Sequence, residues 1–172
     1  MPLLEAGNAV PDSWIKVGDE DALPDSAPAL ITLDRFQREK DALAGRNAPL
    51  GVLLPSDAKP ESIADSLDRI SLVAIQFPVF KDGRGFTIAR TLRERYGYKG
   101  EIRAVGHVLI DQHVFLLRCG FTTVEIPEVA KAAEWKQALG QYDIAYQGSM
   151  MDDEPLSLFR RHVAASDLTK TK

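Results

Sequence analysis

The five residues Lys81-Asp82-Gly83-Arg84-Gly85 have the clearest capacity for binding chemistry in this 172-residue sequence. They follow an apolar run that ends at Phe77, and they precede a segment with helical periodicity. A loop in this position places the free N–H groups and positive dipole of a helix N-terminus beside two cationic side chains. The sequence therefore predicts a site for phosphate or a sulfur oxyanion at Lys81, Gly83, Arg84 and Gly85. The alternative is that the glycines only permit a tight turn.

Arg103 and Glu125 are charged residues within strand-like segments, at 101–106 and 122–126, that are expected to be neighbours in a sheet. Two interpretations of them stay open. The side chains form a structural ion pair, which is costly to break once it is buried. Otherwise Arg103 binds the oxyanion and Glu125 orients the guanidinium.

His107, Asp111 and Glu125 are the candidates for acid–base catalysis. His107 follows a predicted strand at the edge where α/β proteins bind ligands, and Asp111 lies one helical turn further on. Such a pair could orient a general base, and it is equally an ordinary local hydrogen bond. The three histidines do not have the spacing of metal ligands, so the sequence predicts no metal site. Cys119, at the end of a predicted helix, is expected to be a buried thiol.

Strands and helices alternate along the chain and must position these residues. The predicted strands are 29–33, 50–54, 72–77, 101–106, 122–126 and 142–146. The predicted helices are 35–44, capped by Asp34, then 60–70, 86–96, 109–118, 127–139 and one from Pro155 onwards. Such alternation predicts right-handed βαβ units and a mostly parallel sheet in one α/β domain, 29–147. Residues 1–28 are a lead-in or short hairpin, and 148–172 are a helix and tail.

Polar residues recur on one side of three successive predicted strands, as Gln76, Arg103, Thr123 and Glu125. A parallel sheet covered by helices on both sides is normally apolar on both faces. A barrel accommodates the pattern, because its strands turn polar side chains inward, but a full (β/α)8 barrel needs roughly 200 residues or more. The sequence thus favours a partial (β/α)-barrel-like sheet over an open doubly wound one. Its concave side would be covered by the terminal segments, by a second copy in a homodimer, or by a partner.

Composition narrows the classes of function. The net charge of −4 disfavours nucleic-acid binding, which needs a basic surface. A single cysteine excludes an internal disulfide. We find no secretory signal and no apolar run near the ~18 residues of a membrane span, so a cytoplasmic protein is expected. The segment Gly83–Ile88 lacks the third glycine of a dinucleotide fingerprint, and no cofactor is predicted.

The block from Phe77 to Phe121, FPVFKDGRGFTIARTLRERYGYKGEIRAVGHVLIDQHVFLLRCGF, resembles a bacterial family of unknown function. Its members are described as probable oxidoreductases involved in sulfite reduction. The opening MPLLE-G and the segment Pro49–Leu54 are also similar, so the resemblance covers nearly the whole chain. The family usually has Asp or Glu where this chain has His107, which argues against that histidine as the catalytic group.

The resemblance implies a setting in assimilatory sulfate reduction and cysteine biosynthesis, with sulfite reductase or another enzyme of that pathway as the partner. The hypothesis we favour is an accessory protein that docks on this machinery. The alternatives are a small enzyme or carrier for a sulfur or phosphate oxyanion at the Lys81–Gly85 loop, and, less favoured, a flavin-dependent oxidoreductase.

Overall fold

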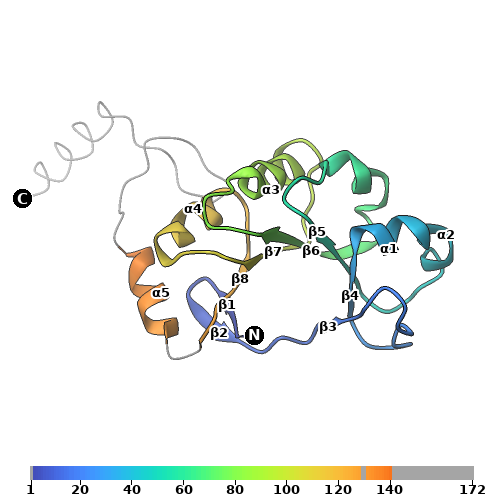
Figure 1. Ribbon diagram of the computed structural model, residues 1–172, viewed down its shortest axis with the longest axis horizontal. Helices are drawn as coiled ribbons and strands as arrows, with labels where there is room; N and C mark the ends of the chain where they lie inside the picture. Colours follow the sequence, from blue (N-terminus) through green and yellow to red (C-terminus); the bar gives the residue numbers. More distant parts are fainter. Residues whose placement is uncertain (1, 129–130, 141–172) are drawn as a thin grey trace, which may run out of the picture.

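One curled sheet of eight strands, in the order β2-β1-β8-β7-β6-β5-β4-β3, organises the computed structural model, which describes residues 2–128 and 131–140 (Figure 1). The strands are β1 (Leu3–Glu5), β2 (Asn8–Val10), β3 (Ile15–Lys16), β4 (Ala29–Thr32), β5 (Leu50–Leu54), β6 (Ile70–Phe77), β7 (Glu101–Gly106) and β8 (Thr123–Glu125). The α-helices are α1 (Leu33–Arg38), α2 (Lys40–Leu43), α3 (Arg84–Glu94), α4 (His113–Arg118) and α5 (Ala132–Leu139), and η1 (Pro60–Ser66) and η2 (Ile110–Gln112) are 3-10 turns.

The strands from β4 to β8 are parallel and lie side by side in sequence order. Among the described strands, β1 pairs antiparallel with β2 in a hairpin and antiparallel with β8, beside which the hairpin joins the sheet. Helices α1, α3 and α4 lie on the same side of the sheet (Figure 1). A doubly wound sheet reverses its strand order and carries helices on both faces. The structure therefore confirms the mostly parallel half-barrel rather than the open doubly wound alternative.

A short connection explains why the sheet must curl. β2 and β3 are consecutive in the chain but lie at opposite edges of the sheet. Eight flat strands would separate these edges by about 34 Å, whereas the connection from Val10 to Ile15 reaches at most about 18 Å. The sheet bends until this connection, which we call the strap (Pro11–Trp14), can cross its concave side (Figure 1).

Hydrophobic side chains pack on both faces of the curled sheet, but unequally. The larger core lies between the sheet and the helices, and includes Val73, Ile75 and Phe77 of β6. A smaller cluster of Leu30, Leu72, Ala74 and Val105 lies on the other face, with Trp14 of the strap packed against it. The strap thus covers the apolar part of the concave face. A terminal segment, a second copy and a partner were the three alternatives predicted to cover this face, and the structure shows a segment from the N-terminal part of the chain there.

Several element bounds differ from those predicted. The helix expected at 35–44 is interrupted at Glu39 and begins at Leu33, because the Thr32 hydroxyl, not Asp34, accepts the N–H of Arg35 at 3.2 Å. The helix expected at 60–70 is the 3-10 turn η1, and the one expected at 109–118 is split into η2 and α4. The strand predicted at 142–146 and the helix from Pro155 lie outside the described residues. Within the described ranges, no helix has the length and apolar character needed to cross a membrane.

The buried His113 links α4 to α5, and its protonation is expected to make the stability of the fold depend on pH. Its ring Nδ1 lies 3.0 Å from the Trp135 carbonyl oxygen, to which it donates, and burial lowers the pKa of the imidazole below the usual 6.5. Below about pH 6.5 this histidine binds a proton in the unfolded chain but not in the folded chain. The free energy of unfolding therefore decreases as the pH is lowered, by at most about 1.4 kcal/mol per pH unit.

We expect the melting temperature of the unmutated protein to fall between about pH 7.5 and pH 5.5, and to fall less in His113→Asn. An asparagine amide can replace the Nδ1–H donor without titrating. Equal pH dependence in the two proteins would show that His113 does not contribute.

Candidate functional site

The Lys81–Gly85 loop follows β6, and its own acidic residue occupies the N-terminus of α3. Asp82 Oδ1 accepts the backbone N–H of Arg84 at 3.1 Å, and both carboxylate oxygens accept from the Arg84 guanidinium, at 2.9 and 2.7 Å. These hydrogen bonds hold the pKa of Asp82 well below its usual range. Arg84 also donates to Ser56 Oγ at 2.9 Å, which ties the loop to the end of β5. An external oxyanion would therefore compete with a carboxylate of the chain itself.

The glycines of this loop serve different purposes. Gly85 is buried, and a Cβ there would lie 2.7 Å from the Phe77 ring, so this glycine lets α3 approach β6 closely. Gly83 has open space around it and an ordinary negative φ. Lys81 stands over the Phe80 ring at 5.6 Å. The expectation of anion binding at the loop stays a prediction.

His107 and Asp111 are both exposed beyond the end of β7. The His107 backbone N–H donates to the Phe77 carbonyl at 2.8 Å, and among the described residues no hydrogen bond joins its ring to Asp111. Gln112 organises this edge instead, because it accepts the N–H of Leu109 and donates to the Phe80 carbonyl, both at 3.0 Å. The catalytic role proposed for His107 and Asp111 remains untested.

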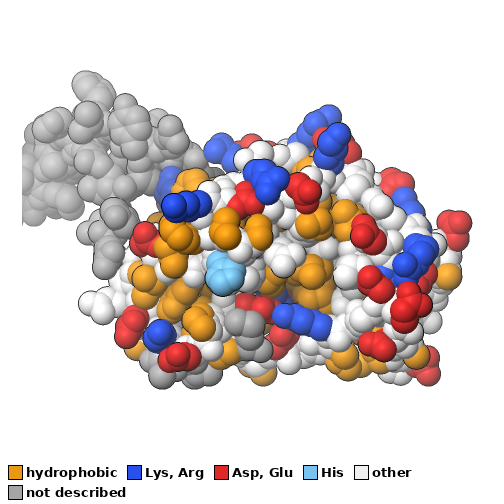
Figure 2. All heavy atoms as spheres, viewed as in Figure 1, with side chains coloured by type: hydrophobic (Ala, Val, Ile, Leu, Met, Phe, Trp, Pro, Cys, Tyr) orange, Lys and Arg blue, Asp and Glu red, His pale blue; other side chains and the backbone are white. Residues whose placement is uncertain are grey.

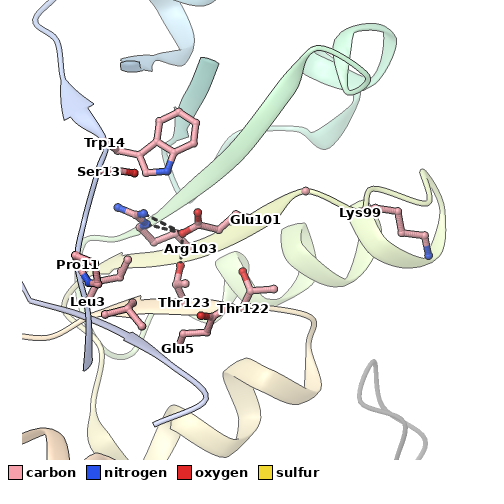
Figure 3. Close-up of a pocket in the computed structure, with 12 residues that line it drawn as sticks. Leu3, Glu5, Pro11, Ser13, Trp14, Lys99, Glu101, Arg103, Thr122 and Thr123 are labelled. Carbon is pink, nitrogen blue, oxygen red and sulfur yellow. Dashed lines mark hydrogen bonds and ion pairs between the residues drawn. The ribbon is translucent and has the colours of Figure 1, made fainter. Parts of the chain in front are cut away.

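Arg103 lies on the concave face and is almost completely buried, with 1% of its side chain exposed. Its Nε and Nη2 donate to Glu101 Oε1 at 3.0 and 2.9 Å, and its Nη1 donates to Asp12 Oδ2 at 2.9 Å. Figure 3 shows the guanidinium pointing toward the strap, with Glu101 and Thr123 beside it. The interpretation of Arg103 and Glu125 as one ion pair is wrong, because Arg103 binds two other carboxylates.

Glu125 has a different partner, at the far edge of the sheet. Lys16 Nζ of β3 lies 2.8 Å from Glu125 Oε1, although β3 and β8 are five positions apart in the strand order. The Glu125 oxygen is buried and accepts no hydrogen bond of good geometry from the described residues. This ion pair across the mouth of the half-barrel is a further sign of how strongly the sheet curls.

A cavity of about 390 Å³ lies between the strap and the beginning of β7. The strap supplies Ser13 and Trp14 to its lining, the sheet supplies Glu101 and Arg103, and the rim carries Glu5 and Lys99. No residue of the Lys81–Gly85 loop lines it. The structure therefore does not unite the loop and Arg103 in one site, as a shared oxyanion site would require.

Sequence reasoning missed the strap and Glu101. The contact of Glu101 with Arg103 could have been predicted, because the two residues are two positions apart in the same strand and must share a face of the sheet. Asp12 lies 91 residues from Arg103, and no local pattern connects the two. No group of three or more His, Cys, Asp or Glu side chains in the described part of the chain is arranged to hold a metal ion.

Comparison with known proteins identifies the family. A search of curated proteins gave no significant match. Residues 51–157, more than half of the chain, match a family of bacterial proteins. These residues include all of β5 except Leu50, and all of β6, β7 and β8 with the loops between them. The chain therefore belongs to the family described as "Bacterial protein of unknown function (DUF934)".

Proposed function

We propose that this protein is a cytoplasmic accessory protein of sulfite reduction in sulfate assimilation and cysteine biosynthesis. It would act by docking on sulfite reductase or another enzyme of that pathway. The metabolic setting rests on the sequence resemblance described above. The docking role rests on one structural observation, an exposed apolar surface at the C-terminal edge of the parallel strands.

This surface, which we call the edge patch, consists of Val79, Phe80, Leu109 and Phe115, whose exposed fractions are 42–54%. Gln112 holds Phe80 and Leu109 together through the two hydrogen bonds described above, and Phe115 follows Gln112 by three residues, on the same helical side. Figure 2 shows hydrophobic side chains gathered over α4 and α5 on one face of the molecule. Contiguous exposed apolar residues of this kind mark protein-interaction surfaces.

The charges beside the edge patch indicate the polarity and charge expected of the partner's surface. Lys81 adjoins Phe80 and forms no ion pair with any described residue, whereas Arg84 is neutralised by Asp82. An interface usually surrounds an apolar centre with a polar rim. The partner surface is therefore expected to be apolar at its centre, with a carboxylate opposite Lys81.

The buried charges of the concave face support docking over catalysis. Arg103 is held by two carboxylates and Glu125 by Lys16, so these groups already serve the fold. The edge patch, in contrast, leaves about half of each side chain exposed, although Phe115 also packs on Phe86. Exposed apolar side chains lower the solubility of a protein, and a partner that covers them is the best explanation for such a surface.

The test is co-purification of sulfite reductase from cell extract, followed by affinity measurement with the purified enzyme. We expect the double variant Phe80→Ser, Phe115→Ser to bind at least about tenfold more weakly, because exposed aromatic anchors carry much of an interface's energy. Ile15→Ser is the matched control, since Ile15 is 47% exposed but lies on β3.

Melting curves of all three proteins check that the fold survives, which matters because the Phe115 ring packs 4.8 Å from Phe86. Failure of the unmutated protein to retain any sulfate-assimilation enzyme would refute the proposal. So would equal loss of binding in the Ile15→Ser control. Independently, a deletion strain should grow on sulfide but not on sulfite as its sulfur source.

A further inference from the structure

Arg103, in the wall of the cavity beneath the strap, is paired with more than one carboxylate. Arg103 supplies one positive charge, whereas Glu101 and Asp12, which both bind it, supply two negative charges. At the rim, Glu5 and Lys99 add one charge of each sign. Asp12 pairs with Arg103 from the strap but does not line the cavity, and the charged residues that do line it, Glu5, Glu101, Lys99 and Arg103, balance one another. The guanidinium is already neutralised by two carboxylates and therefore does not offer a free site for an oxyanion.

One carboxylate oxygen of Glu101, Oε2, is available to accept a hydrogen bond from a ligand. Its Oε1 accepts three hydrogen bonds, two from Arg103 and one from the Thr123 hydroxyl at 2.6 Å. Its Oε2 accepts none from the part of the chain that the structure describes. Figure 3 shows this second oxygen turned toward the side where Trp14 lies. An ionised carboxylate oxygen that is fixed through its sister atom is a ready partner for an N–H donor.

Trp14 suits the same ligand. Its indole lines the cavity and is anchored by packing on the small cluster of the concave face. A cation near an indole face is attracted by the ring's negative quadrupole, and an alkyl chain packs favourably on the same ring. The cavity volume of about 390 Å³ falls within the range of small-molecule sites.

We infer that the cavity binds a small organic cation, a protonated amine on a short alkyl chain. The amine would donate to Glu101 Oε2, the chain would lie along Trp14, and a second cationic group would be attracted to Glu5 at the rim. This site is separate from the edge patch, so it does not depend on the docking proposal.

Three four-carbon probes that differ in charge test the inference by titration calorimetry on the full-length protein at low ionic strength. We expect putrescine, the diamine, to bind, while butanediol and succinate do not. Glu5→Gln and Glu101→Gln should each weaken putrescine binding by about tenfold or more, since each removes a charged acceptor.

Glu61→Gln is the control, because Glu61 is an exposed carboxylate on η1 that pairs with Arg95, away from the cavity. Should Glu101→Gln unfold by releasing Arg103, the exposed Glu5→Gln still decides the matter. The inference is overturned if putrescine fails to bind at millimolar concentration, or if Glu61→Gln weakens binding as much as Glu5→Gln. Binding of succinate in place of putrescine would also overturn it, and would make Arg103 an anion receptor.

Discussion

Replacing Arg103 with Met is expected to lower the free energy of unfolding by about 3 kcal/mol, among the largest effects of any single charge change in this protein. The substitution leaves Glu101 and Asp12 close together at the concave face without a cation. Removing one member of a buried ion cluster costs about 3–5 kcal/mol, and the partial exposure of the two carboxylates favours the lower value. For a chain of this length the melting temperature should fall by about 6–12 °C.

Arg95→Met provides the matched comparison. Arg95 pairs with Glu61 at 3.3 Å, but both side chains are exposed, and such surface pairs contribute about 0–1 kcal/mol. Thermal and urea unfolding of both variants measure the difference. If Arg103→Met were as harmless as Arg95→Met, the cluster would not be the buried bridge between strap and sheet that the structure shows.

The strap also determines how the Arg103 variant should fail. Asp12 is held to the sheet by Arg103, and the neighbouring Trp14 packs on the concave cluster. Loss of the guanidinium leaves only the apolar contact of Trp14 to retain the strap. We therefore expect the backbone amides of Asp12, Ser13, Trp14 and β3 to exchange hydrogen faster in Arg103→Met than those of β5 and β6, which lie in the centre of the sheet.

Local sequence signals were sufficient for the centre of the fold. Segments 50–54 and 101–106 were predicted with the bounds that β5 and β7 have, because apolar strand residues end there at Pro55 and Gly106. The alternation of Arg103 with Ile102 and Ala104 was also sufficient to predict that one sheet face is polar, and hence the half-barrel. Both inferences depend only on neighbouring residues.

Contacts between residues far apart in the sequence could not be predicted from local patterns of this kind. The strap joins the two edges of the sheet, and the contacts of Asp12 with Arg103 and of Lys16 with Glu125 each link residues more than ninety positions apart. The oxyanion site was predicted from the cations, the glycines and the helix N-terminus, without regard to the acidic residue among them. Its sequence contained Asp82, the residue that binds Arg84 in the structure, so the competing anion was visible but was not weighed.

Gly106→Ala is expected to be comparably severe, at about 3 kcal/mol, for a reason that concerns the backbone. Gly106 ends β7 with φ at +95°, a conformation that other residues rarely adopt. An added Cβ would also lie 2.5 Å from the Phe77 carbonyl oxygen, which already accepts the N–H of His107. The alanine must therefore distort both the end of β7 and the connection that leads to Leu109 in the edge patch.

Two other glycines separate the contributions of conformation and contact. Gly97 has φ at +63° but open space around it, so Gly97→Ala should cost only the conformational strain, about 1 kcal/mol. Gly83 has neither constraint, and Gly83→Ala should be neutral or slightly stabilising, since alanine restricts the unfolded chain. Urea unfolding of the three variants should rank Gly106→Ala as the least stable and Gly83→Ala as the most stable. Equal losses for Gly106→Ala and Gly97→Ala would mean that the Phe77 carbonyl moves aside freely, and that the junction between β7 and the edge patch is softer than its hydrogen bonds imply.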